Sequence, residues 1–329
     1  MRRSSFLLAT LLLVAACGTT DTGVDATTTS TIGTTTTAPM ATTSTLGATT
    51  TTTADANFPV TVEADNGPVT IDEAPDSIVS LSTVATEILF AIGAGDQVVA
   101  VDDQSNYPGE APMTDLSGFT PNVEAILSYE PDLVFISYDP GDLVASLETA
   151  GVPVVSFGAA ATLDDTFRQI ESTGVSTGHA EQASDVTSSI EEDLREIADE
   201  APEIPEGTTY FHEIDSNLYT LTSTTFFGQI YTMFGLANIA DAADESGSGY
   251  PQLSSEFVVA ADPDLIFLAD TLYGESPETV AERPGWGTLT AVDEGNIVEL
   301  DSDIASRWGP RIVEFARSIS AALADYDTG

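Results

Sequence analysis

Two stretches of this sequence, Asn122–Phe135 (NVEAILSYEPDLVF) and Ser254–Phe267 (SSEFVVAADPDLIF), follow one pattern. In both, a polar residue precedes a glutamate, six residues follow it, and then come Pro-Asp-Leu, a β-branched residue and phenylalanine. A polar N-cap and a proline that ends the segment predict a short helix in each copy. The apolar runs that follow, Leu133–Ile136 and Leu265–Leu268, are typical of strands buried on both faces of a parallel sheet.

The residues around the two copies also correspond to each other. A predicted strand and a helix precede each copy and a further strand follows it: Ile78–Leu81, Val84–Ile92 and Val152–Phe157 for the first, and Tyr210–Ile214, Phe226–Phe234 and Ile297–Leu300 for the second. Strands that alternate with helices predict an α/β fold of two lobes, each with its own mostly parallel sheet.

Between the lobes, residues 176–201 carry apolar residues at helical spacing, from Ala183 through Ile190 to Ile197. Pro202 and Pro205 end this pattern. The sequence therefore predicts one long helix between an N-terminal lobe (58–175) and a C-terminal lobe (202–329), and a helix of this kind would limit hinging.

The first 57 residues predict export and attachment to a membrane. Arg2 and Arg3 precede a short apolar run that ends at Cys17, which indicates a cleaved signal peptide over residues 1–17. The segment before Cys17 resembles a bacterial lipobox, so we expect this single cysteine to carry a lipid. Residues 18–57 are nearly half threonine and lack an apolar period, which predicts a disordered tether.

The charge of the chain excludes polyanionic partners. Aspartate and glutamate number 53, the 8 basic residues are all arginine, and the formal net charge is −45. Such a surface repels nucleic acid. It suits a salty environment, where counterions screen the repulsion between carboxylates.

Five segments together resemble one family. They are Pro75–Ser82 (PDSIVSLS), Ala85–Gly93 (ATEILFAIG), Asn106–Pro108 (NYP), Pro251–Glu256 (PQLSSE) and Ser306–Arg311 (SRWGPR). In this order they are similar to the cobalamin and ferric-siderophore binding proteins of ABC importers, and the resemblance extends from residue 58 to the C-terminus.

The resemblance implies two Rossmann-like lobes that hold a metal chelate in the cleft between them and deliver it to an importer. The expected partners are a dimeric permease with its ATPase and a membrane reached through the lipid, with the protein a monomer on the outer face of the cell membrane. No resident cofactor and no catalysis are expected, because the chelate is cargo.

Two glutamates are implied to dock on the permease, one from each lobe. They fall on Glu124 and Glu256, which the internal repeat also places at equivalent positions. Each is expected in the first turn of its helix, where a carboxylate also favours the helix dipole.

Several residues fall at or near positions where cobalamin-binding relatives contact their ligand. Phe119, Tyr219 and Tyr250 offer aromatic faces suited to a corrin ring or a catecholate. Arg307 is a candidate partner for an anionic group of the chelate. Arg311 matches the same motif, but a structural role at the start of the last helix is expected for it.

Two departures from the cobalamin binders concern the same cleft. Gln104 stands where those proteins carry a tyrosine, and Trp308 adds a large ring beside Arg307. The choice between a corrinoid and a ferric siderophore therefore stays open.

Two other functions are less well supported by the residues. Direct binding of a transition-metal ion needs several converging ligands, but His179 and His212 are the only histidines. For an enzyme, the sequence contains neither a nucleophile elbow nor a phosphate loop. Gly93–Gly95 follows a predicted helix, whereas a dinucleotide fingerprint would precede one.

Overall fold

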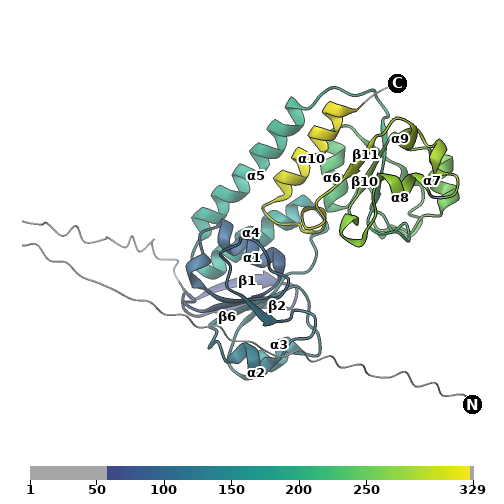
Figure 1. Cartoon of the computed structure of the whole chain (residues 1–329). Helices are drawn as coiled ribbons and strands as arrows, with labels where there is room; N and C mark the ends of the chain where they lie inside the picture. Colours follow the sequence, from purple (N-terminus) through teal and green to yellow (C-terminus); the bar gives the residue numbers. More distant parts are fainter. Residues whose placement is uncertain (1–57, 327–329) are drawn as a thin grey trace, which may run out of the picture. The chain divides into compact units, whose positions relative to one another are not determined.

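The computed structural model describes residues 58–326 (Figure 1). The predicted signal peptide, the threonine-rich tether and Cys17 lie outside this range. The described residues form two parallel sheets with helices on both faces, preceded by an antiparallel hairpin of β1 (Val60–Ala64) and β2 (Gly67–Ile71). The predicted α/β fold with two mostly parallel sheets is confirmed.

The N-terminal lobe, from β1 to α4, contains a five-stranded sheet in the order β5-β4-β3-β6-β7. Its strands are β3 (Ile78–Leu81), β4 (Val98–Asp102), β5 (Met113–Leu116), β6 (Leu133–Ile136) and β7 (Val154–Ser156). Alternate residues of the buried strands point to opposite faces, so one face packs on α1 (Thr83–Ala91) and α4 (Leu163–Thr177). The other face packs on α2 (Val123–Leu127) and α3 (Leu143–Thr149).

The C-terminal lobe, from β8 to α10, contains a four-stranded sheet in the order β11-β10-β8-β9. Its strands are β8 (Thr209–Glu213), β9 (Ala237–Asn238), β10 (Leu265–Leu268) and β11 (Ile297–Glu299). One face packs on α6 (Phe226–Met233) and α10 (Ile312–Asp325), and the other on α7 (Ser255–Ala261), α8 (Pro277–Ala281) and α9 (Thr290–Asp293). Single 3₁₀ turns complete the described chain: η1 (Gly95–Gln97), η2 (Ile239–Ala242), η3 (Thr271–Tyr273), η4 (Trp286–Thr288) and η5 (Ile304–Ser306).

The internal repeat has a structural reason in both sheets. Strands β3, β4, β6 and β7 of the first sheet lie in the same relative order as β8, β9, β10 and β11 of the second. The repeated Pro-Asp ties the start of two neighbouring strands together. Asp132 accepts hydrogen bonds from the backbone of Asp76 and Ser77 ahead of β3, and Asp264 accepts them from the backbone and hydroxyl of Thr209 in β8.

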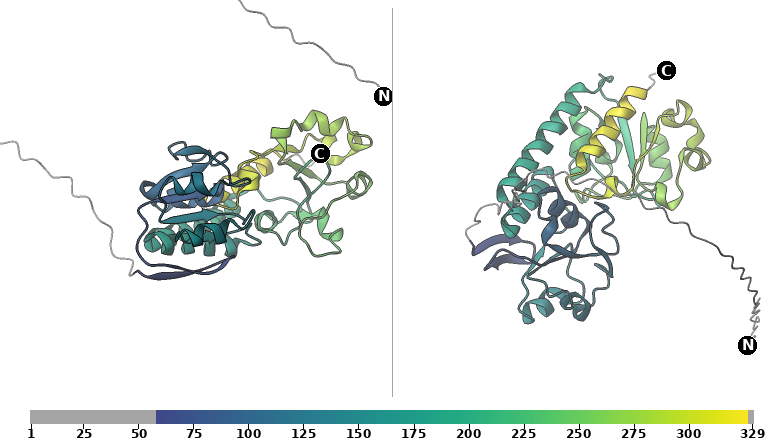
Figure 2. Two further views of the ribbon diagram at one scale, coloured as in Figure 1. Left: turned by 90° about the horizontal axis from the view of Figure 1, so that it is seen from below. Right: turned by 60° about the vertical axis from the view of Figure 1, so that its left-hand side comes forward.

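The connection between the lobes is the helix α5 (Ala180–Glu200), which is 21 residues long. It begins four residues later than the sequence pattern predicted, because Gly178 adopts φ +82° and ends α4. Helix α5 then packs along α4 and α10, which Figure 1 and Figure 2 show as neighbouring helices. Gly174 allows the close approach of α4 to α5, since a Cβ there would lie 2.3 Å from the Cβ of Ala183.

The apolar core is continuous from one lobe to the other. Ile88 of α1, Ile170 of α4, Ile190 of α5 and Phe315 of α10 belong to one buried cluster that reaches both sheets. Opening a hinge between the lobes would expose part of this cluster to water, which costs free energy. The continuous core therefore agrees with the limited hinging expected from the long helix.

Candidate functional site

A hollow of about 450 Å³ lies where the carboxyl ends of strands from both sheets meet. Gln104 follows β4 and Ala160 follows β7 in the N-terminal lobe, while Ile214 follows β8 and Ala269 follows β10 in the C-terminal lobe. Ligands of open α/β sheets bind at this end of the strands, where the strand order reverses. We call this hollow the cleft.

Three of the predicted ligand-binding residues line the cleft: Gln104, Tyr250 and Trp308. Tyr250 is 45% exposed, so part of this residue is open to a ligand. The Trp308 Nε1–H donates to Oε1 of Gln169 at 3.1 Å, a contact that fixes the ring. The side chain of Gln104 is exposed and bonds only its neighbour Asp103, which leaves it able to turn toward a ligand.

Phe119 and Tyr219 lie outside the lining of the cleft. Phe119 follows β5, is 67% exposed, and packs its ring 5.8 Å from that of Tyr138, which follows β6. Tyr219 follows β8, is 43% exposed, and its backbone bridges to Gln252. Both residues extend from the carboxyl-end loops of their sheets, so they offer aromatic surface beside the cleft rather than within it.

Arg307 does not have the environment expected for a ligand partner. Its side chain is 8% exposed, and its guanidinium donates to Glu87 of α1 at 2.8 Å and to Asp303 at 2.9 Å. It also donates to the carbonyl of Gln104, at 3.4 Å. The guanidinium thus has carboxylate partners within the protein, one of which, Asp303, lines the cleft, and its contact with an anionic group of a chelate stays a prediction. In this structure Arg307 joins the two lobes, because one of its two acidic partners, Glu87, comes from the N-terminal lobe.

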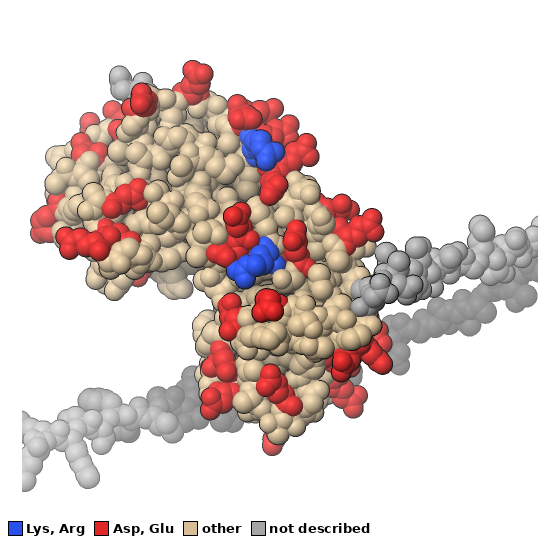
Figure 3. Space-filling view, turned by 180° about the vertical axis from the view of Figure 1, so that it is seen from behind, with Lys and Arg blue, Asp and Glu red and all other residues tan. Residues whose placement is uncertain are grey.

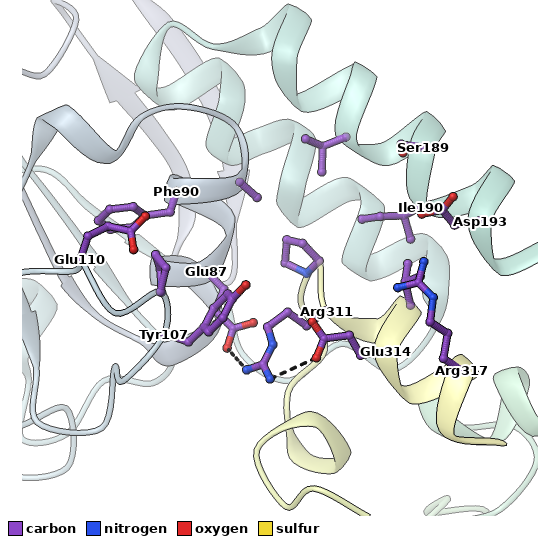
Figure 4. A pocket seen from close by; sticks show the side chains of 15 residues that line it. Glu87, Phe90, Tyr107, Glu110, Ser189, Ile190, Asp193, Arg311, Glu314 and Arg317 are labelled. Atoms are coloured by element: carbon purple, nitrogen blue, oxygen red, sulfur yellow. Dashed lines mark hydrogen bonds and ion pairs between the residues drawn. The ribbon is translucent and has the colours of Figure 1, made fainter. Parts of the chain in front are cut away.

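Arg311 strengthens the same junction, as Figure 4 shows. Its guanidinium lies 4.2 Å above the ring of Tyr107, 3.5 Å from Glu87 and 3.3 Å from Glu314. Burial raises the pKa of the Glu87 carboxyl above its ordinary value, although both arginines act to lower it. The structural role expected for Arg311 fits these contacts, and Glu87 is a junction residue that the sequence did not single out.

Two further groups of cleft residues were missed from the sequence. Phe227 and His212 supply apolar wall from α6 and β8, and Leu272 and Tyr273 extend from η3. Leu272 and Tyr273 lie in the loop after the fully buried strand β10, and this position is a signal that could have identified them.

His212 has the environment of a core residue. It is 1% exposed, and its Nδ1 lies 2.9 Å from the hydroxyl of Tyr231. Burial lowers its pKa to about 3, so the ring is neutral at ordinary pH. Within residues 58–326 no group of three or more His, Cys, Asp or Glu side chains is placed to hold a metal ion.

The predicted docking glutamates occupy equivalent positions in the two lobes. Glu124 lies in the first turn of α2 and Glu256 in the first turn of α7, as predicted. Asn122 and Ser254 cap these helices through their side chains. Both carboxylates are exposed and form no ion pair with any residue of the described range, so they are available to a cationic partner.

Acidic side chains cover both lobes on the face shown in Figure 3, and the arginines there lie in two small groups among them. The described helices include none with the length and hydropathy needed to cross a bilayer.

Comparison with known proteins places the chain in a family. The family described as "Periplasmic binding protein" matches residues 78–304. The uncharacterized ABC transporter substrate-binding lipoprotein YvrC of Bacillus subtilis is 32% identical over 276 residues, which cover 81% of this chain and 86% of that protein. The cobalamin-binding protein of Halobacterium salinarum is 33% identical over 268 residues, covering 78% and 72%.

A solved structure supports the same assignment. A possible iron-binding periplasmic solute-binding protein of Staphylococcus epidermidis superposes with a TM-score of 0.67 at 25% identity, covering 76% of this chain and 99% of that one. The chain therefore belongs to the periplasmic binding protein family.

Proposed function

We propose that this protein is the extracytoplasmic binding component of an ABC importer and that it captures a metal chelate of the cobalamin or ferric-siderophore type. The cleft at the carboxyl ends of both sheets carries this proposal. Phe227, Tyr250 and Trp308 give it aromatic walls, while Gln104 and Asp303 add a few polar groups. A largely apolar hollow with few polar groups is the usual form of a small-molecule site.

The relatives support a chelate as cargo without choosing between its two types. One is named for cobalamin and another for iron, and the aromatic residues of the cleft suit either. We propose further that Cys17 carries the lipid anchor on the outer face of the membrane, and that the protein acts as a monomer. The chelate is then cargo for transport, with no resident cofactor and no chemical conversion.

Fluorescence titration of the full-length protein tests the cargo. Trp286 is fully buried and Trp308 lines the cleft, so a chelate in the cleft should quench Trp308 selectively. The probes are cyanocobalamin, a ferric trihydroxamate and a ferric tricatecholate, with Fe³⁺ and Zn²⁺ alone as controls. We expect saturable binding of one chelate and no stoichiometric binding of either metal alone.

A Trp308→Phe variant assigns the signal. It should lose the quenching while calorimetry still detects the same chelate. Tight binding of Fe³⁺ or Zn²⁺ without a chelator, or binding of none of the three chelates, would contradict the proposed function.

A further inference from the structure

The two most exposed large apolar side chains of residues 58–326 are neighbours. Leu272 is 74% exposed and Tyr273 is 87% exposed. Both line the cleft, yet neither belongs to any buried apolar cluster of the described chain. Exposed apolar side chains grouped at the edge of a pocket mark a surface that another molecule covers.

The segment that carries them is anchored at both ends. Arg283, just after α8, donates to both carboxylate oxygens of Glu213 at the end of β8 and to Glu275 at 2.6 Å. At the other end, Oγ1 of Thr271 donates to the carbonyl of Leu300, which follows β11, at 3.2 Å. Because the base is held by these contacts, presenting Leu272 and Tyr273 costs little ordering entropy when a ligand binds.

The position of the segment indicates a contact with cargo in the cleft rather than with a partner elsewhere on the protein surface. Residues 270–274 leave the carboxyl end of β10, next to β8, where the strand order of the second sheet reverses. From the N-terminal lobe the cleft receives only Gln104, Ala159 and Ala160, which are short or polar. The large apolar surface of the cleft therefore comes from the C-terminal lobe.

We propose that Leu272 and Tyr273 form an apolar arm that contacts the periphery of the bound chelate and selects chelates with a flat or apolar outer face. This inference rests on the proposed function. The cleft, at about 450 Å³, falls in the lower half of the range for small-molecule pockets. A bulky chelate must then extend beyond it, and the arm lies where the excess would emerge.

The test compares a Leu272→Ser and Tyr273→Ser double variant with a Met113→Ser control in the full-length protein. Met113 is 59% exposed on β5 and does not line the cleft. Calorimetry with the chelate that the wild type binds, among cyanocobalamin, ferric trihydroxamate and ferric tricatecholate, should show Kd raised about tenfold or more in the double variant. The control should stay within about twofold, as should Tyr273→Phe, which keeps the ring.

Each other outcome has a separate meaning. An unchanged Kd in the double variant, with binding by the wild type intact, overturns the arm alone. An unchanged Kd with loss of uptake in cells also overturns it and assigns the pair to a contact with the permease. If the wild type binds none of the three chelates, the proposed function fails and the arm fails with it.

Discussion

The two lobes share one architecture but differ in the chemistry that they bring to the cleft. In the N-terminal lobe, short hydroxyl side chains surround the carboxyl end of β3: Oγ1 of Thr86 lies 2.9 Å from Oγ of Ser80 and 3.0 Å from Oγ of Ser105, and Ser137 donates to Ser82. In the C-terminal lobe, the corresponding strand β8 carries His212, and its last residue, Glu213, is fully buried against Arg283.

This difference separates features that both sheets share from features of one lobe. The helix caps and the Pro-Asp clamps occur in both lobes, so they stabilise the sheets themselves. The aromatic and apolar surface of the cleft occurs mainly in the C-terminal lobe, which we propose contacts the chelate. The experiments below compare the lobes, from the largest expected effect to the smallest.

Glu124 and Glu256, the predicted docking residues of the two lobes, should contribute equally to chelate uptake. We expect the Glu124→Ala and Glu256→Ala double variant to lower chelate uptake in cells by more than tenfold, because truncating charged anchors of an interface removes most of its binding energy. Each single variant should have a smaller effect of similar size. Uptake measured with labelled chelate checks this.

The affinity of the free double variant is the control. Neither carboxylate lines the cleft, so Kd for the chelate should stay within about twofold of wild type. A large loss of affinity for the chelate would contradict the docking role. A strong loss of uptake from only one of the two single variants would contradict the equal contribution of Glu124 and Glu256.

An arginine that pairs with a buried glutamate should matter more for stability where it is the only partner of that glutamate. Arg283 is the only arginine that pairs with Glu213 among the described residues, so Arg283→Met should lower the free energy of unfolding by about 3–5 kcal/mol. Glu87 is paired by both Arg307 and Arg311, so Arg311→Met should cost only about 1–2 kcal/mol.

Urea unfolding followed by circular dichroism measures these losses. Arg195→Met is a matched control, because Arg195 is exposed on α5 and forms no ion pair with the described chain. Equal losses for Arg283→Met and Arg311→Met would contradict the expectation that a glutamate paired with two arginines tolerates the loss of one.

The two Pro-Asp clamps should differ in strength. Asp264 is partly buried and accepts from the backbone and hydroxyl of Thr209 at 2.7 and 2.8 Å, whereas Asp132 is exposed and accepts two bonds at 3.0 Å. We expect Asp264→Ala to lower the free energy of unfolding by about 2–3 kcal/mol and Asp132→Ala by about 1 kcal/mol. The same urea titration decides this, and the reverse order would show that burial does not set the strength of the clamp.

The C-terminal lobe should also respond to pH through two buried carboxyls. Burial raises the pKa of Glu213 to about 7, and it raises the pKa of Asp270 above its ordinary value. Among the described residues the ion-pair partner of Glu213 is Arg283 alone, and Asp270 lies beside this pair without an ion pair of its own. The folded protein then binds more protons than the unfolded chain. The resulting contribution of the two carboxyls to the free energy of unfolding is complete below about pH 4.5 and is lost as pH rises toward 7.

Asp270→Asn isolates this contribution, since it removes one of the two carboxylates. Because one carboxyl with a raised pKa is gone, the free energy of unfolding of the variant should fall less than that of the wild type as pH rises from 5 to 7.5. Asp132→Asn in the N-terminal lobe is the control, and a difference of the same size there would indicate a general effect of the high negative charge.

Much of the fold could be predicted because its signals are local. The strands Ile78–Leu81, Leu133–Ile136 and Leu265–Leu268 agree with the structure to the residue, since short, largely apolar runs of this kind are stable when buried in a parallel sheet. The helix between the lobes was predicted a few residues too long at its start, because the break at Gly178 depends on the turn from α4 into α5.

The candidate site was less predictable, because its residues are brought together by pairing across the lobes. Gln104, Tyr250 and Trp308 were expected in the cleft and lie there, but Phe119 and Tyr219 lie beside it. Motif position alone does not tell whether an aromatic ring points into a cleft or toward a neighbour on its own loop.

The sequence by itself determined that two α/β lobes would form from one repeated pattern, because caps, prolines and buried strands act within a few residues of each other. Only the tertiary structure decided what Arg307 does. Its partner Glu87 is 220 residues away in the chain, and a buried guanidinium is stable only beside a carboxylate that neutralises it. Leu272 and Tyr273 were likewise not predicted from the sequence. Their proposed role depends on which surfaces of the two lobes meet around the cleft.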